Sequence, residues 1–285
     1  MKDVTNAMRA HILTAAVPYI KQYTDQYVVV KYGGNAMIDE GLKKSVMKDL
    51  MLLQLVGVKV VLVHGGGPAI NSTLDAMKIE SRFANGLRVT DEATMDVVQM
   101  VLAGKVNKGL VADLTDLGGK AVGLCGVDGN MIQVHKQNEE LGYVGSIDTI
   151  DTSIIDDVIS RGYIPVISSI GMGADGKTYN INADTVAAKI AGALKAETMV
   201  AMTNIDGVLR DVHDPSSLIS KITMAEADQL KAEGIIAGGM IPKVDCCLEA
   251  IKSGAQKVFI INGEIPHAIL IELLTDEGLG TMFVK

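Results

Sequence analysis

The sequence alternates short, continuously apolar runs rich in valine and isoleucine with longer segments of helical periodicity. A short apolar run without alternation indicates a strand that is buried on both faces. When helical segments separate such strands, a mainly parallel sheet with helices on both sides is expected. We therefore predict an α/β fold, a three-layer αβα arrangement around an open, mainly parallel sheet. The predicted strands cover residues 27–30, 58–63, 121–125, 164–167, 198–202 and 257–261.

The segments between these strands predict helices and one hairpin. Residues 131–135 and 143–148 flank a polar turn and indicate the hairpin, and residues 179–181 suffice only for an edge strand. We place a lobe boundary near residues 175–180, which gives a helical arm (1–26), a first lobe (27–178) and a second lobe (179–285). The predicted helices cover residues 41–55, 91–117, 183–194 and 243–253.

The arm carries an apolar stripe at Met8, Ile12, Ala15 and Ala16, and Pro18 is expected to bend or end its helix. The pattern fits either a terminal surface helix or an arm used in oligomerisation or regulation.

Composition limits the classes of function. The chain has 285 residues, 48% of them hydrophobic, which suffices for one large or two modest domains. A net charge of −8 argues against general nucleic-acid binding and against an anionic membrane surface. No apolar run reaches the ~18 residues of a membrane span. The three cysteines, Cys125, Cys246 and Cys247, lack CxxC spacing, so we expect core thiols, no metal site and a cytoplasmic protein.

Glycine-rich segments follow two of the predicted strands, at residues 31–34 (KYGG) and 64–68 (HGGGP). Ligands bind at the carboxyl ends of parallel strands, and glycine amides at a helix start form an anion site. Three consecutive glycines lose too much chain entropy for an ordinary turn, so we predict phosphate contact there. Lys31 could otherwise simply reach solvent, and His64 is more simply structural than a base.

Three polar segments are further candidates. Asn85-Gly86 predicts a turn that holds Arg88 near a helix capped by Thr90 or Asp91, and a guanidinium can bind a carboxylate with two hydrogen bonds. Without context, Arg88 is an ordinary surface arginine.

The second polar segment holds Asn180, Asn182 and Asp184 before an apolar helix. There an aspartate is usually a cap, and its functional role would be to orient lysines or a metal. In the third, Lys243 follows two glycines in a first helical turn, where the helix dipole disfavours a cation. Such a local conflict indicates a site that needs positive charge.

Residues 171–178 (GMGADGKT) match the patterns of both a P-loop and a dinucleotide-binding loop. A P-loop requires a helix that starts at Gly-Lys-Thr, whereas this sequence continues as an extended segment. We interpret it as a polar turn and keep a P-loop at Lys177 as the alternative.

Taken in order, these segments resemble the amino-acid kinase family, most closely its branch that phosphorylates N-acetyl-L-glutamate. The resemblance implies an acceptor-binding lobe at 27–178, a nucleotide-binding lobe at 179–285, and transfer of the ATP γ-phosphoryl group to the γ-carboxylate, the second step of arginine biosynthesis. Mg²⁺ would arrive with ATP. The resemblance covers residues 31–37, 63–68, 85–90, 123–126, 180–184, 238–243 and 278–282.

The resemblance also implies roles for individual residues. Lys31 and Lys243 match two lysines that stabilise the transition state, and Asp184 matches the carboxylate that orients them. Asn204 stands where the family usually has aspartate, which leaves the adenosine contacts open. The other implied residues are Gly66, Gly67, Arg88 and Asn180 for the acceptor, Gly33, Gly34, Gly65 and Gly239 for phosphate, and Thr203, Asp206 and Gly207 for the nucleotide loop.

Residues 15–20 resemble the extra helix of arginine-inhibited members, where it links dimers into a hexamer and borders the arginine site. The implied arginine-site residues here are Tyr19, Glu272 and Gly280.

Two other functions stay open. One is a kinase for a related N-blocked diacid such as α-aminoadipate, because one methylene gives only ~1–3 kcal/mol of discrimination. The other is a non-catalytic sensor of ATP or arginine on the same fold, against which the joint presence of Lys31, Asp184 and Lys243 argues.

Overall fold

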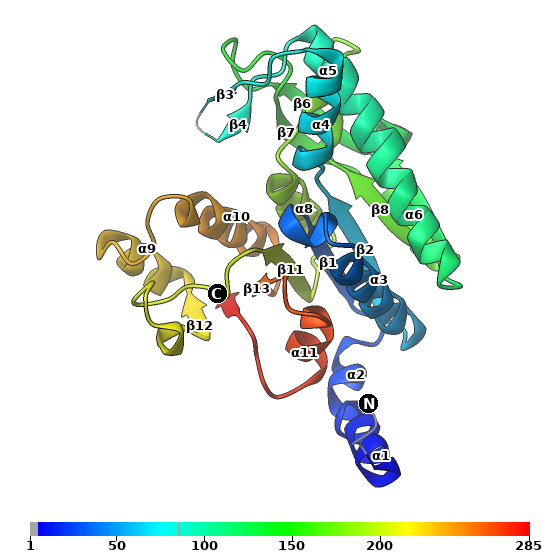
Figure 1. Ribbon diagram of the computed structural model, residues 1–285, viewed down its shortest axis with the longest axis vertical. Helices are drawn as coiled ribbons and strands as arrows, with labels where there is room; N and C mark the ends of the chain where they lie inside the picture. Colours follow the sequence, from blue (N-terminus) through cyan, green and yellow to red (C-terminus); the bar gives the residue numbers. More distant parts are fainter. Residues whose placement is uncertain (1–4, 85) are drawn as a thin grey trace.

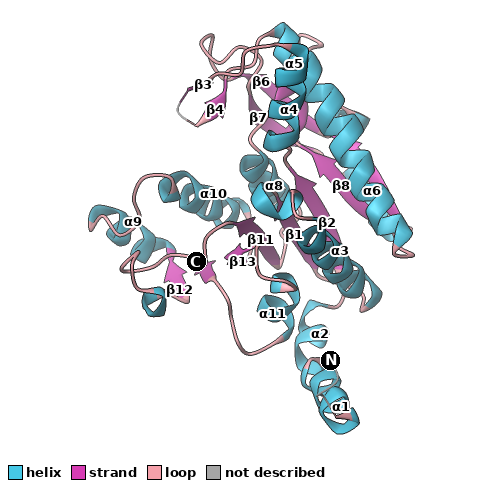
Figure 2. Cartoon of the chain, in the orientation of Figure 1, coloured by secondary structure: helices cyan, strands magenta, loops and turns pink. Residues whose placement is uncertain are grey.

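The computed structural model describes residues 5–84 and 86–285, and an eight-stranded sheet forms its centre (Figures 1 and 2). Neighbouring strands are parallel, except that β13 and β14 are antiparallel. The predicted fold class is confirmed, and all six predicted strands lie in this sheet. In spatial order the strands are β12 (Lys221–Thr223), β14 (Thr281–Val284), β13 (Lys257–Asn262), β11 (Thr198–Thr203), β1 (Tyr27–Tyr32), β2 (Lys59–His64), β8 (Ile164–Ser168) and β5 (Ala121–Cys125).

Alternation of side chains along each strand produces the two helical layers. In β1, Val28 and Val30 pack into one layer and Val29 into the other, and all three are fully buried. One layer consists of α2 (Val17–Tyr23), α3 (Glu40–Leu55), α6 (Asn107–Asp116) and α11 (Ala268–Leu274). The other consists of α7 (Ser153–Ser160), α8 (Ala183–Ala193), α9 (Met224–Ala232) and α10 (Met240–Ser253).

The two halves of the chain share this sheet. Strands from residues 27–178 form one side of it and strands from residues 179–285 form the other, and β1 pairs with β11 where they meet. The lobe boundary itself stays a prediction. None of the helices in residues 5–84 and 86–285 is long and apolar enough to cross a membrane.

A smaller four-stranded sheet lies at the top of Figure 1, near α4 (Gly67–Met77) and α5 (Glu92–Gln99). Its β6–β7 pair confirms the predicted hairpin, and β10 is the predicted edge strand. Residues 174–177 turn from β9 into β10, and the next helix begins only at Ala183, so the P-loop alternative at Lys177 is wrong. The strands are β10 (Thr178–Asn180), β9 (Ile170–Gly173), β6 (Ile132–Lys136) and β7 (Gly145–Ile150), with a separate pair β3 (Phe83–Ala84) and β4 (Leu87–Arg88).

The helix predicted for residues 91–117 is continuous but not uniform. A π-helix, η2 (Met100–Val106), separates α5 from α6. Such wide turns are rare and occur mostly at functional sites. Asp91 caps α5, since its Oδ1 accepts a hydrogen bond from the Thr94 N–H at 2.8 Å. Short 3₁₀ turns complete the fold: η1 (Gly34–Met37), η3 (Asp128–Asn130) and η4 (Pro215–Ser217).

The arm forms two helices, α1 (Asn6–Ala15) and α2, and α1 projects from the bottom of the molecule in Figure 1. The break predicted near Pro18 occurs at Ala16, and the proline is the second residue of α2, where its missing N–H is harmless. None of the residues of α1 is buried. Residues 1–4 and Asn85 of the predicted Asn-Gly turn lie outside the described residues.

Candidate active site

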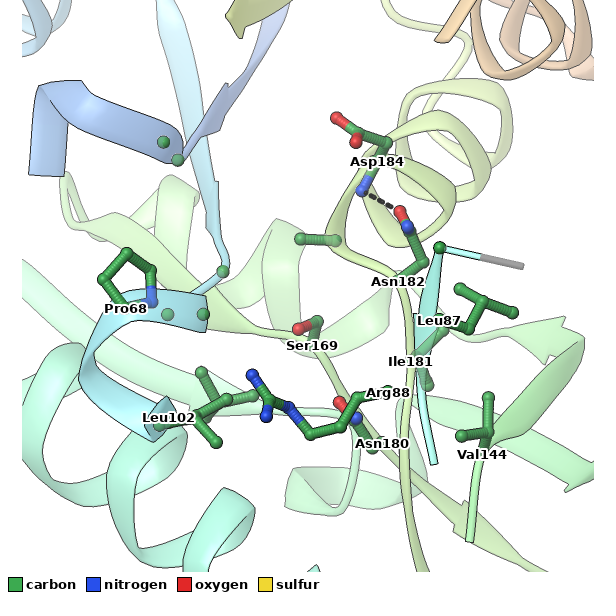
Figure 3. Close-up of a pocket in the computed structure, with 18 of the residues that line it drawn as sticks. Pro68, Leu87, Arg88, Leu102, Val144, Ser169, Asn180, Ile181, Asn182 and Asp184 are labelled. Atoms are coloured by element: carbon green, nitrogen blue, oxygen red, sulfur yellow. Dashed lines mark hydrogen bonds between the residues drawn. The ribbon is translucent and has the colours of Figure 1, made fainter. Parts of the chain in front are cut away.

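A cavity of about 280 Å³ opens at the carboxyl ends of β1 and β2 (Figure 3). Parallel α/β sheets bind their ligands at this edge. The cavity brings together most of the residues that the sequence singled out from both halves of the chain. These are Lys31, Gly33, Gly34, Gly65, Gly66, Gly67, Arg88, Asn180 and Asp184.

An ion pair joins the two halves at this cavity. The Nζ of Lys31, at the end of β1, lies 3.0 Å from Oδ1 of Asp184, in the first turn of α8. Asp184 is not the helix cap, as an aspartate at this position usually would be, because Asn182 takes that place. The Asn182 Oδ1 accepts a hydrogen bond from the N–H of Asp184 (Figure 3) and another from the N–H of Thr185. The carboxylate of Asp184 therefore remains available to hold the lysine.

The two glycine-rich segments leave room and exposed amides beside this pair. A Cβ on Gly33 would lie 3.1 Å from Lys31 Nζ, so any side chain there would crowd the ammonium group. Gly67 begins α4 with Pro68 next to it, as predicted. Within residues 5–84 and 86–285, no acceptor is found for the N–H groups of Gly66 and Gly67. Free amides at a helix N-terminus attract anions.

Arg88 lines the cavity from β4, and its partners are neutral. Its Nη2 donates to Oδ1 of Asn71 at 2.6 Å, its Nη1 donates to Oγ of Ser81, and its guanidinium lies 4.7 Å from the centre of the Phe83 ring. Only 7% of Arg88 is exposed, and burial lowers its pKa. No carboxylate pairs with it in the described part of the chain. A buried cation without a counter-ion favours an incoming carboxylate.

Asn180 is tied to the same group of residues. Its Nδ2 donates to Oγ1 of Thr90 at 3.2 Å, and that hydroxyl donates to the carbonyl of Arg88 at 2.9 Å. The chain of hydrogen bonds links β10 to the backbone that carries the guanidinium. Arg88 is thus positioned from its side chain and from its backbone.

Lys243 and Gly239 line a second cavity, of about 540 Å³, rather than the first. Lys31 and Lys243, which we expected to converge on one point, therefore line two adjacent cavities in this structure. Asp184 borders both cavities, as do Leu87 and Asn182. The sequence also placed Lys243 in the first turn of a helix, and it is the fourth residue of α10, which begins three residues earlier than predicted.

The predicted nucleotide loop lies at the end of β11, outside both cavities. Oγ1 of Thr203 accepts a hydrogen bond from the Ile205 N–H, and Oδ1 of Asp206 accepts one from Asn262 at 2.8 Å. Gly207 has φ +142°, and a Cβ there would lie 2.5 Å from Oγ1 of Thr281. Only glycine fits this tight turn.

The predicted arginine-site residues lie near the join of arm and body. Tyr19 of α2 packs against the same core cluster as α11. Oε2 of Glu272 accepts hydrogen bonds from the N–H groups of Leu279 and Gly280 at 2.7 and 3.1 Å. Burial raises the pKa of Glu272. Part of this carboxylate therefore holds the loop in place rather than facing solvent.

His64 and the cysteines have structural environments, as the sequence indicated. His64 is fully buried at the end of β2, and burial lowers its pKa to about 4, so the ring is neutral near pH 7. Burial also raises the pKa of Cys246 to about 11. No group of three His, Cys, Asp or Glu side chains suited to a metal occurs in residues 5–84 and 86–285.

The residues that support the site were not among those predicted from the sequence. Asn71 follows Pro68 by three positions in α4, a spacing that could have been noticed, whereas Ser81 gives no local signal. Leu102 and Asn107, which lie against the triglycine segment and His64, were hidden inside an ordinary helical pattern.

Comparisons with known proteins identify similar chains. The sequence pattern of the amino acid kinase family matches residues 26–262. The chain is 51% identical to the acetylglutamate kinase of Brachyspira hyodysenteriae, with 100% of both chains covered. It is 54% identical to the acetylglutamate kinase of Clostridium kluyveri over 96% of this chain and 97% of that relative.

Among solved structures, the N-acetylglutamate synthase of Neisseria gonorrhoeae, in complex with coenzyme A and N-acetyl-glutamate, superposes with a TM-score of 0.84 at 27% identity. The match covers 97% of this chain and 63% of the synthase, so this chain spans less than two thirds of that protein. The same synthase with coenzyme A and L-arginine gives a TM-score of 0.80 at 24% identity.

Burial of His64 predicts a specific dependence of stability on pH. The unfolded state binds a proton near pH 6.5 and the folded state only near pH 4. Stability must therefore fall as the pH falls through this window. Between pH 7 and pH 4, the unfolding free energy of the wild type should drop by about 3 kcal/mol more than that of His64→Gln. Urea unfolding of both proteins at each pH measures the difference, and parallel losses would contradict it.

Proposed function

The chain belongs to the amino acid kinase family, and from this membership we propose that it is an acetylglutamate kinase. It transfers the γ-phosphoryl group of ATP to the γ-carboxylate of N-acetyl-L-glutamate and releases ADP and N-acetyl-L-glutamyl 5-phosphate, a step of arginine biosynthesis. Full-length relatives at 51% and 54% identity support this function. The observation that carries it is a single cavity that holds an ion-paired lysine, free glycine amides and an unpaired guanidinium.

The acceptor is a dicarboxylate, and the cavity offers one cationic group without a counter-ion and one set of amides. We assign the α-carboxylate to Arg88, because this buried cation has only neutral partners within the described residues. Asn180 lies beside it and contacts the rest of the acceptor. The γ-carboxylate then faces the N–H groups of Gly66 and Gly67, next to the ion pair of Lys31 with Asp184.

The chemistry needs positioning and charge neutralisation more than proton transfer. A carboxylate with a pKa of about 4.3 is already ionised near pH 7, so the attacking oxygen needs no general base. That oxygen attacks the γ-phosphorus in line while the bond to the β-phosphate oxygen breaks. Lys31 and Lys243 stabilise the charge on the transferring oxygens from the two sides of Asp184, and Gly33, Gly34 and Gly239 supply backbone amides. The N–H of Gly65 already donates to the carbonyl of Tyr32 at 3.2 Å, so Gly65 leaves room for the phosphate rather than binding it.

The nucleotide is assigned to the second half of the chain. Thr203, Asp206 and Gly207 form its loop at the end of β11, and Mg²⁺ enters with ATP, held mainly by phosphate oxygens. Asn204 in that loop is exposed and supplies an amide where an aspartate is usual. An enzyme of this type, dependent on ATP, is expected in the cytoplasm.

We further propose a homo-hexamer, a trimer of dimers, that arginine inhibits. Met8, Ile12 and Leu13 of α1 are each more than half exposed, which suits a helix that packs against another copy of the chain. The oxygen of Glu272 that the loop amides leave free, Oε1, can accept from a guanidinium beside Tyr19. The related synthase structure with L-arginine is consistent with an effector of this kind.

The first prediction concerns the acceptor. Incubation with ATP, Mg²⁺ and hydroxylamine should yield hydroxamate from N-acetyl-L-glutamate. Turnover per KM should be about 10-fold or more lower with N-acetyl-α-aminoadipate, since one methylene corresponds to ~1–3 kcal/mol. A preference for the longer acid would mean that the acceptor is N-acetyl-α-aminoadipate instead. No product from either acid would favour the non-catalytic sensor.

The second prediction concerns the lysines. Lys31→Ala and Lys243→Ala should each lower kcat by about 100-fold or more, because each removes charge stabilisation from the transition state. Lys177→Ala is the matched control. Lys177 lies on the β9–β10 turn, where its Nζ donates to the Tyr143 hydroxyl, and its loss should leave ATP use unchanged. Steady-state kinetics with both substrates varied measures all three. Unchanged turnover in Lys243→Ala would reject the role of the second cavity.

The third prediction concerns the arm. Removing residues 1–15 deletes α1 but leaves Tyr19 and the buried Tyr23 of α2 in place. The shortened protein should be an active dimer that arginine no longer inhibits, because its inter-dimer contact is lost. Light scattering gives the mass, and the hydroxamate assay with and without arginine gives the sensitivity. A shortened enzyme that is still inhibited would separate arginine binding from assembly.

A further inference from the structure

His64 and Asn107 form a buried polar network directly behind the triglycine segment. The Nδ2 of Asn107 lies 3.1 Å from Nε2 of His64, and Nδ1 of His64 lies 2.8 Å from the carbonyl oxygen of Gly65. Both residues are at most 1% exposed. Neither touches the cavity, and the mechanism above assigns no chemistry to either of them.

The surroundings of Asn107 fix the orientation of its amide. Its Nδ2 also lies within hydrogen-bond distance of the carbonyl oxygens of Leu124 and Val166, at 3.3 and 2.8 Å, and its Oδ1 accepts from Nζ of Lys108. An amide flipped by 180° would direct its oxygen at two carbonyls. Nδ2 therefore points at His64, and an amide nitrogen can only donate.

This orientation fixes the tautomer of His64. The Gly65 carbonyl, 2.8 Å from Nδ1, can only accept, so the single proton of the neutral ring sits on Nδ1, and Nε2 faces the Asn107 amide as an acceptor. Nδ1 then donates to the Gly65 carbonyl. Burial keeps the ring neutral, since its pKa lies near 4.

The hydrogen bond to Gly65 sets the direction of the next amide. In a planar trans peptide the C=O of one residue and the N–H of the following residue point in opposite directions. With the Gly65 oxygen held toward the buried imidazole, the Gly66 N–H points away from the imidazole, and Gly66 is one of the residues that line the cavity.

The π-helix η2 fixes the other side of Gly66. A Cβ on Gly66 would lie 2.6 Å from Cδ2 of Leu102 and 3.3 Å from Cγ2 of Val106, both in η2. Asn107 is the first residue after this π-helix. The π-helix η2 therefore packs against Gly66 and also positions Asn107, the side chain that contacts His64.

The Asn107 amide occupies a space that only a glycine at position 123 leaves open. A Cβ on Gly123 of β5 would lie 1.9 Å from Oδ1 of Asn107. Gly123 belongs to a segment, residues 123–126, that no step of the reaction uses. Its glycine leaves the volume that the Asn107 amide occupies.

We infer that His64 is a positioning residue for the reaction: through its Nδ1–H it fixes the Gly65–Gly66 peptide, so that the Gly66 N–H is aimed at the anion in the cavity, and Asn107 selects the tautomer that does so. The inference rests on the proposed function, in which that amide contacts the reacting carboxylate or phosphoryl oxygens.

Three variants of His64 separate its hydrogen bond to Gly65 from its role in filling space in the core. His64→Asn places an amide nitrogen near the position of Nδ1 and keeps the donor to Gly65. His64→Gln places its amide near Nε2, which keeps a partner for Asn107 but removes the donor to Gly65. His64→Leu removes both.

We expect kcat to fall by about 100-fold in His64→Gln and His64→Leu and by less than about 10-fold in His64→Asn, by comparison with other lost oxyanion donors. The KM values for both substrates should change less than about threefold, since the amide acts mainly in the transition state. Thermal unfolding of each variant is measured alongside. A kcat for His64→Gln at or above that of His64→Asn, or losses that simply follow stability, would overturn the inference.

The tautomer is measured without any kinetic assay. The chain has five histidines, and the imidazole ¹⁵N signals that vanish in His64→Asn belong to His64. In the wild type they should show a protonated Nδ1 and a bare Nε2 from pH 6 to 8. A protonated Nε2 would overturn the inference even if the wild type proves to be an active kinase. A wild type that phosphorylates no acceptor would instead refute the proposed function, and the tautomer result would still hold.

Discussion

The ion pair between Lys31 and Asp184 is the contact on which the site depends. Lys31 is the penultimate residue of the central strand β1, and only 11% of its side chain is exposed, so its ammonium group needs a partner. Asp184 provides that partner from the first turn of α8, in the other half of the chain. Asn182 makes this possible by capping the helix itself. The pair therefore adds, at the cavity, a second connection between the two halves of the chain, which also meet where β1 pairs with β11.

Around this pair, an acidic protein builds a local excess of positive charge. The chain carries a net charge of −8, yet the cavity presents an arginine with neutral partners and two free glycine amides. Fields from distant surface carboxylates are screened over roughly 8–10 Å in physiological salt, whereas groups within the cavity act at short range. Replacing Asn71 or Ser81 by a carboxylate would neutralise Arg88 from within, so the neutrality of these partners is part of the binding site.

Much of the fold and the inner residues of the site could be predicted because their signals are local. Continuous apolar runs such as residues 58–63 identify buried parallel strands, and glycines after β1 and β2 identify the ligand edge. Other features depend on tertiary contacts. The π-helix has the same apolar periodicity as an ordinary helix, and β12 and β14 are strands chiefly because they pair with each other and with β13. The pairing of Arg88 with Asn71 and Ser81 joins three separate segments; the spacing of Asn71 from Pro68 is a weak signal for one partner, and Ser81 gives none.

The position of Lys243 links the fold to the reaction. It lies near the amino end of α10, which packs on α8 and is tied to it by an ion pair between Lys189 and Glu249 of 2.5 Å. At the carboxyl end of α10 the two helices approach so closely that a Cβ on Gly192 would lie 2.3 Å from the Cβ of Ser253. The helix pair is thus fixed at one end, and Lys243 stands at the other, in a cavity that shares Asp184 with the first. In the proposed reaction both lysines act on one phosphoryl group, and with the carboxyl end of α10 held against α8, movement at its amino end would bring Lys243 closer more easily than sliding of the whole helix.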